Sequence, residues 1–89
     1  MAVLIRILNP GMTPEVYDAI ARGAAASLKA AAGFQFHVAF PSEEGVVVVE
    51  VWDDPDQHMQ WFDDNVKPHL PPGTELSHEV TKLHNVLKP

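Results

Sequence analysis

The stretch Val46-Val47-Val48-Val49-Glu50-Val51-Trp52 is the most informative part of the sequence, because its pattern predicts a β-strand that is apolar on both faces. A sheet that carries helices on only one side should present polar residues on its other side. This strand has no such polar face, so its second face must be covered too. A second copy of the sheet is the simplest cover, and we expect a homodimer that joins through the open sheet face.

The segments on either side of this stretch predict three more strands and two helices. Each helix opens with a capping residue and a proline in its first turn, at Thr13-Pro14 and at Asp54-Pro55. The order strand, helix, strand, strand, helix, strand folds through right-handed crossovers into an antiparallel sheet with both helices on one face. We therefore predict a single ferredoxin-like α+β domain, βαββαβ, over residues 1–89, which dimerises into an α/β barrel. The expected elements are strands Ala2–Leu8, Phe34–Phe40, Val46–Trp52 and Leu76–Leu87, and helices from Thr13 to Gly33 and from Asp54 to Val66.

The spacing of apolar residues predicts which side of each helix faces the sheet. The stripe on the first helix is thin in its middle, where small residues such as Ala21, Ala24 and Ala25 gather. Small residues either let a helix sit close to a sheet or leave room for a ligand, and close packing is the interpretation that we prefer. The predicted stripes are Val16, Ile20, Ala24 and Leu28 on the first helix, and Met59, Phe62 and Val66 on the second.

His37 and Glu50 are the pair best suited to catalysis. Strict alternation places His37 with Gln35 and Ala39 on one face of its strand, opposite the face of Phe34, Phe36, Val38 and Phe40. A hairpin loop of two or four residues puts His37 opposite Glu50 and Gln35 opposite Trp52, whereas a three-residue loop separates them. A buried carboxylate needs a partner, and an imidazole held in one tautomer suits a general base. The alternative is a structural pair, or a salt bridge across the dimer interface.

The other four histidines carry less information. Pro68 breaks the second helix and lets His69 turn back over a pocket mouth, with simple surface exposure as the alternative. His84 is expected at a dimer contact. We expect His58 to be a solvated helix residue, and His78 gives no functional indication.

Composition excludes several classes of function. The 12 acidic and 6 basic residues give a net charge of −6, which argues against binding to nucleic acid or to an anionic membrane surface. The chain has no cysteine, so disulfides and thiolate metal sites are excluded. His37, His69 and Glu50 could meet at a metal, but they follow no local ligand spacing, and no phosphate loop or dinucleotide motif is present. We expect no cofactor and no metal, and, with no signal peptide or membrane-spanning run, a cytoplasmic protein.

Three segments carry a family resemblance: Val48-Val49-Glu50-Val51-Trp52-Asp53-Asp54, Met59-Gln60-Trp61-Phe62 and Val66-Lys67-Pro68-His69. They resemble the dimeric α/β-barrel proteins of the antibiotic-biosynthesis monooxygenase (ABM) type. In that group a strand ending in an acid, one residue and an aromatic leads into a helix that a histidine follows. The group includes cofactor-free monooxygenases that oxidise anthrone-like polyketides, haem-degrading monooxygenases and polyketide cyclases. The haem degraders carry an asparagine on the first strand, which Leu4-Ile5-Arg6-Ile7 lacks, and the cyclases carry a tyrosine near the second helix, where this chain has none.

The resemblance implies a pocket between the helices and the sheet, with Trp61 and His69 at the aromatic and histidine positions of the family. We expect His69 or His37, the latter supported by Glu50, to deprotonate the substrate. The leading hypothesis is a cofactor-independent monooxygenase acting on a small aromatic or polyketide-type substrate of secondary metabolism. A redox-neutral cyclase or isomerase and a non-catalytic small-molecule-binding accessory protein remain as alternatives. The expected pocket residues are Trp61, Trp52, Tyr17, Phe36 and Phe62.

Overall fold

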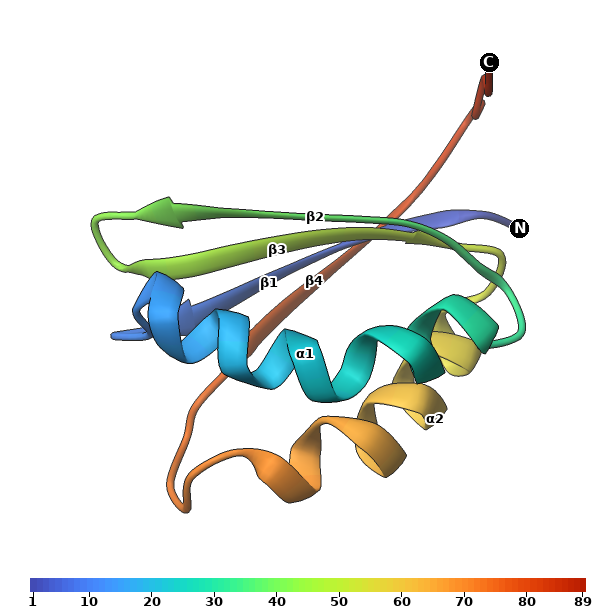
Figure 1. Ribbon diagram of the computed structural model, residues 1–89. Helices are drawn as coiled ribbons and strands as arrows, with labels where there is room; N and C mark the ends of the chain where they lie inside the picture. Colours follow the sequence, from blue (N-terminus) through green and yellow to red (C-terminus); the bar gives the residue numbers. More distant parts are fainter.

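A four-stranded antiparallel sheet carries two helices on one of its faces (Figure 1). The structure is a computed structural model that describes residues 1–89. The strands lie in the order β2-β3-β1-β4, which is the ferredoxin-like arrangement predicted above. In chain order the elements are β1 (Val3–Pro10), α1 (Pro14–Ala30), β2 (Phe34–Ser42), β3 (Gly45–Trp52), α2 (Pro55–Asn65), the short 3-10 turn η1 (Lys67–His69) and β4 (Ser77–Lys82).

Both helices begin where the sequence predicts, because each start carries a side chain that caps the first turn. The Thr13 hydroxyl accepts a hydrogen bond from the Val16 amide at 3.2 Å, and the Asp54 carboxylate accepts one from the Asp56 amide at 2.8 Å. A proline follows each cap, at a position where the missing N–H has no intrahelical partner to lose. Neither helix is long and apolar enough to cross a membrane.

β3 lies inside the sheet between β1 and β2, so both of its edges are paired. Side chains at its even-numbered positions face the helices, and Val46, Val48, Glu50 and Trp52 are all buried there. On the other face Val47 is also buried, while Val49 and Val51 are partly buried. The doubly apolar strand predicted from the sequence is therefore present.

The β2–β3 hairpin closes through Glu43 and Glu44, and its two-residue loop sets the predicted register. His37 lies opposite Glu50. The strict alternation predicted for β2 is wrong at its start, because the register shifts between Phe34 and Phe36. Phe34, and not Gln35, lies opposite Trp52. The extra residue, Gln35, turns aside and donates a hydrogen bond to Asp53 Oδ1, which leaves Phe34 on the same side of the sheet as His37.

The predicted helix faces are correct at Leu28 and Phe62, which are buried, and at Ile20, Ala24 and Val66, which are half-buried and line the space between the helices and the sheet. They are wrong at Val16 and Met59. Val16 is 46 % exposed and Met59 is 38 % exposed. At these two positions the residue that faces inward is a direct neighbour of the predicted one. Tyr17 takes the inward position at the start of α1, and His58, four residues before Phe62, takes it on α2.

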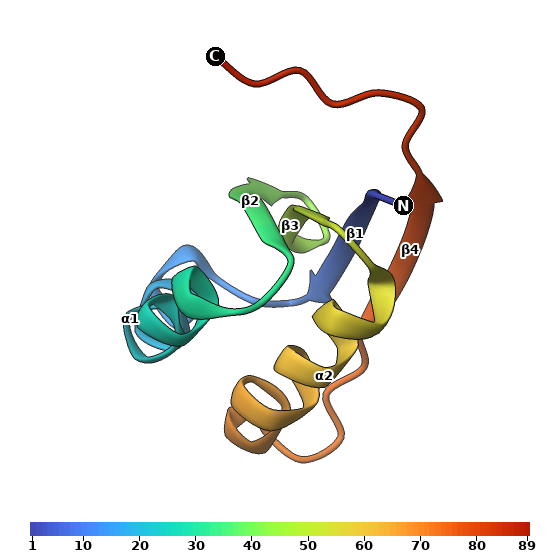
Figure 2. The same ribbon diagram turned by 90° about the vertical axis from the view of Figure 1, so that its right-hand side faces the viewer.

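The sheet face opposite the helices is uncovered (Figures 1 and 2). On β2 this face carries Phe36, Val38 and Phe40, which are 58 %, 41 % and 45 % exposed. Beyond the sheet, the last strand is shorter than predicted. It ends at Lys82, so His84 lies outside it on an exposed tail.

Candidate active site

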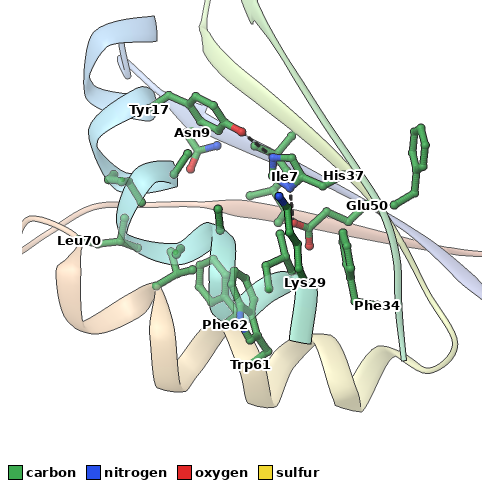
Figure 3. A pocket seen from close by; sticks show the side chains of 18 of the residues that line it. Ile7, Asn9, Tyr17, Lys29, Phe34, His37, Glu50, Trp61, Phe62 and Leu70 are labelled. Carbon is green, nitrogen blue, oxygen red and sulfur yellow. Dashed lines mark hydrogen bonds and ion pairs between the residues drawn. The ribbon is translucent and has the colours of Figure 1, made fainter. Parts of the chain in front are cut away.

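A cavity of about 400 Å³ lies between the two helices and the sheet (Figure 3). It is bordered by 20 residues, of which 15 are hydrophobic. The wall supplied by α1 is built from Ala21, Ala24 and Ala25, with Ile20 and Leu28 beside them. The close-packing interpretation of this alanine-rich stripe is therefore wrong: the missing side-chain volume is the cavity.

Three polar side chains form a chain of hydrogen bonds at one end of this apolar cavity (Figure 3). The Tyr17 hydroxyl lies 2.5 Å from His37 Nε2, and His37 Nδ1 lies 2.6 Å from Glu50 Oε2. α1 supplies Tyr17, β2 supplies His37 and β3 supplies Glu50. All three border the cavity, so a ligand that fills it meets this chain of hydrogen bonds.

The donor and the acceptor of each of these two hydrogen bonds follow from the protonation states of the three side chains. An ionised Glu50 can only accept, so the proton between the two groups belongs to His37 Nδ1. In the neutral imidazole Nε2 is then an acceptor, and the Tyr17 hydroxyl must donate to it. Burial raises the pKa of Tyr17, and the nearby charges of Glu50 and Asp18 raise it further, so the phenol keeps its proton. The arrangement is that of a general base whose orientation a carboxylate holds.

Glu50 is only 2 % exposed, and its second oxygen is also engaged. Trp52 Nε1 donates to Glu50 Oε1 at 3.0 Å, and His58 Nε2 lies 3.3 Å from the same oxygen. The prediction that His58 is a solvated helix residue is wrong, because its side chain is fully buried. Burial lowers the pKa of His58, although the charge of Glu50 acts in the opposite direction, so the buried ring is neutral at pH 7.

His78 on β4 completes a cluster of rings behind Glu50. Its imidazole centroid lies 5.8 Å from that of His58 and 5.0 Å from the Phe62 ring. Burial lowers the pKa of His78 as well. This residue, which carried no indication in the sequence, therefore packs against the back of the site.

Two of the aromatic residues expected in the pocket, Trp61 and Phe62, line the cavity from α2. Trp61 is held in place by a hydrogen bond from its Nε1 to Ser27 Oγ at 3.2 Å. Trp52 does not line the cavity, because it is fully buried in the core beside Glu50. Phe36 borders the cavity, but it neighbours His37 on an extended strand, so its ring projects to the opposite, open face.

His69 is not brought to the site. It lies in η1, it is exposed, and it is absent from the cavity wall. The structure thus separates His69 from His37 and Glu50, and no three His, Asp or Glu side chains are grouped so that they could hold a metal ion.

Several residues of the site gave no usable signal in the sequence. Asn9 is buried at the end of β1, where its side chain donates to the Val46 carbonyl oxygen at 3.0 Å and borders the cavity. Lys29 is the one lysine or arginine on the cavity wall. An alternating pattern on β1 could have indicated that Ile7 and Asn9 share a face, but only the packing of α1 shows that a cavity lies above them.

Two solved structures of SnoaB, a cofactor-independent oxygenase from Streptomyces nogalater, are similar to this chain in fold. They superpose with TM-scores of 0.61, for a mutant, and 0.62, each at 15 % sequence identity and over 99 % of this chain and 97 % of SnoaB. No protein-family model and no curated protein sequence matches the chain. At this level of identity the likeness concerns the fold, and it agrees with the ferredoxin-like layout that the ABM-type resemblance implies.

Proposed function

We propose that this chain is a cofactor-independent oxygenase that acts on a small hydroxylated aromatic or polyketide-type substrate. The observation that carries the proposal is the Tyr17–His37–Glu50 chain of hydrogen bonds at the end of an otherwise apolar cavity. A cavity of about 400 Å³ falls within the ordinary size range of small-molecule sites. The likeness in fold to SnoaB supports the same kind of chemistry by analogy.

The proposed chemistry starts with proton transfer. A substrate whose acidic C–H or O–H group reaches the Tyr17 oxygen gives its proton to that oxygen while the Tyr17 hydroxyl passes its own proton to His37 Nε2, and Glu50 stabilises the imidazolium that forms. The electron-rich substrate anion then reduces molecular oxygen. For a CH₂ group flanked by aromatic rings, one oxygen atom enters the product as a ketone and the other leaves as water, so the substrate supplies all the electrons.

The rest of the cavity suits a flat, apolar substrate. Trp61, Phe62 and Phe34 offer ring surfaces for contact, and the alanines of α1 leave the space that the substrate occupies. In this proposal the orientation of the substrate is set by Tyr17 and His37 at one end and by these apolar contacts along its length.

Oxygen uptake with a panel of anthrone-type substrates tests the proposal. We expect His37→Gln to lower kcat by about 100- to 10,000-fold, because it removes the base, and Tyr17→Phe to lower it less. His84→Gln is the matched control, since His84 is exposed and lies outside the sheet. His69→Ala tests the second candidate base. The proposal fails if no member of the panel consumes oxygen, or if His37→Gln turns over like the wild-type protein.

A redox-neutral cyclase or isomerase is the second candidate, and the protonated Tyr17 hydroxyl favours it. A protonated phenol beside an unprotonated imidazole forms an acid–base pair that can enolise and reprotonate a substrate without an oxidant. Turnover that continues under nitrogen would support this candidate against the oxygenase. Ligand binding without any turnover, together with Glu50→Gln lowering stability but leaving affinity unchanged, would indicate a binding protein instead.

A further inference from the structure

Glu50 is shared between two imidazoles that lie on different sides of it. His37 approaches Oε2 from the cavity, and His58 approaches Oε1 from the core. His37 is in reach of a ligand, whereas His58 is fully buried and cannot contact one. A carboxylate that supports a base is thus contacted from behind by a second titratable group.

The surroundings of His58 leave it little choice of tautomer. Both of its nitrogens are buried, and neither has an aligned hydrogen-bond partner. The ring packs edge-on against Trp52, at 5.4 Å between centroids, and beside Phe62 and His78. Glu50 Oε1 is the acceptor within reach, at 3.3 Å from Nε2. A lone pair on Nε2 would face the carboxylate and repel it, so a neutral His58 carries its proton on Nε2, directed at Glu50.

We infer that His58 is a positioning residue that tunes the basicity of His37 through the carboxylate of Glu50. The inference rests on the proposed role of His37 as the base. Trp52 Nε1 already donates to Oε1, and a second donor there draws further negative charge away from Oε2, so Glu50 holds a protonated His37 less firmly than it would without His58. Without His58, His37 should keep its proton to higher pH.

The other charged and titratable groups around the two imidazoles are few. Three groups lie around His58: Glu50 on β3, His78 on β4 and Asp63 on α2, the helix that also carries His58. His37 faces Glu50 and, from α1, Tyr17, with Lys29 also on the cavity wall. Because burial lowers the pKa of His58, this ring acts on Glu50 as a neutral donor and leaves the substrate proton to His37.

The test is an NMR titration of the His37 imidazole in the wild-type protein, in His58→Gln and in His58→Phe. The Gln amide nitrogen can occupy the place of Nε2 and donate to Glu50, whereas Phe keeps the ring and removes the donor. We expect the His37 midpoint to rise in His58→Phe by about half a pH unit or more, and to stay within about 0.2 units of wild type in His58→Gln. A role confined to packing would leave the three midpoints equal, and that result overturns the inference.

A second measurement uses the wild-type protein alone and does not depend on whether His58→Phe folds. The ¹⁵N shifts of the His58 ring distinguish its two neutral tautomers. The Nε2–H form is expected, and the Nδ1–H form would overturn the inference. Neither experiment requires turnover, so the absence of oxygen uptake would count against the proposed function and not against the coupling between His58 and His37.

Discussion

Glu50 is the residue around which the site is built. A carboxylate inside a sheet is costly unless its lone pairs are satisfied, and here both oxygens have partners. Trp52 and His37 donate to it directly, and His58 lies within reach. The same contacts that make burial of the charge tolerable also hold His37 in the tautomer that a general base requires.

The buried histidines predict how stability depends on pH. Burial lowers the pKa of His58 and His78, whereas an unfolded histidine titrates near 6.5. Below about pH 6.5 these two histidines bind protons in the unfolded chain but stay neutral in the folded chain. Protonation therefore stabilises the unfolded state, and the free energy of unfolding falls as the pH is lowered through this range. Urea unfolding should therefore give a smaller free energy of unfolding at pH 5.5 than at pH 7.

The contribution of His58 to this loss can be isolated. It is at most about 1.4 kcal/mol per pH unit for a single group. His58→Gln should reduce the difference between the two pH values, whereas His84→Gln, at an exposed position, should leave it unchanged. A wild-type protein that is as stable at pH 5.5 as at pH 7 would contradict the prediction.

At the scale of elements, the composition of α1 makes the cavity. A helix with large apolar residues along its inner face would fill the space against the sheet, whereas Ala21, Ala24 and Ala25 leave it open. Tyr17 stands at the start of the same face and supplies the hydroxyl that reaches His37. One helix thus provides both the space and one polar group of the site.

Filling this space should abolish binding. Ala24→Leu places a larger side chain in the cavity wall, while Ala26→Leu makes the same change at an exposed position of the same helix. With a hydroxylated polycyclic aromatic as probe, we expect the thermal shift on ligand addition to be lost in Ala24→Leu and kept in Ala26→Leu. Equal shifts in the two variants would place the ligand somewhere else.

In the whole molecule, the helices cover one face of the sheet and leave the other face open (Figure 2). The helices and the cavity occupy one face, while the other exposes Phe36, Val38 and Phe40 side by side on β2. Contiguous apolar surface of this kind is typical of an interface. The prediction of a homodimer through this face therefore stands as drawn from the sequence, and it accounts for the doubly apolar β3.

Sedimentation tests the dimer directly. We expect the wild-type protein to sediment at about twice the chain mass of 9.8 kDa. Val38→Glu places a charge on the open face and should yield a folded monomer. Val16→Glu is the matched control, because Val16 is 46 % exposed and Val38 is 41 % exposed. Val16 lies on α1, on the other side of the sheet, so this variant should remain dimeric. A wild-type monomer would leave the apolar open face without an explanation.

The fold could be predicted from the sequence because its signals are local. Two capped and proline-started helices and four β-rich segments are each legible within about ten residues, and handedness rules leave one simple topology. The pairing of His37 with Glu50 was also accessible, because a two-residue hairpin loop converts sequence separation into register. The bulge at Gln35 could not be predicted, because one extra residue in β2 does not change the alternation of apolar and polar residues in the sequence.

The other half of the site was decided by tertiary structure. Whether α1 packs tightly or stands away from the sheet depends on how both helices settle on it, so the alanines could signal contact or space equally well. The packing of α1 brings Tyr17 to His37, and the packing of α2 buries His58 behind Glu50. Neither contact is local in sequence. Periodicity and loop length in the sequence were thus enough to predict the elements, their order and the pairing of His37 with Glu50. The cavity and the contacts of Tyr17 and His58 with this pair could be seen only in the folded chain, because side-chain contacts between distant segments depend on how each helix is rotated against the sheet.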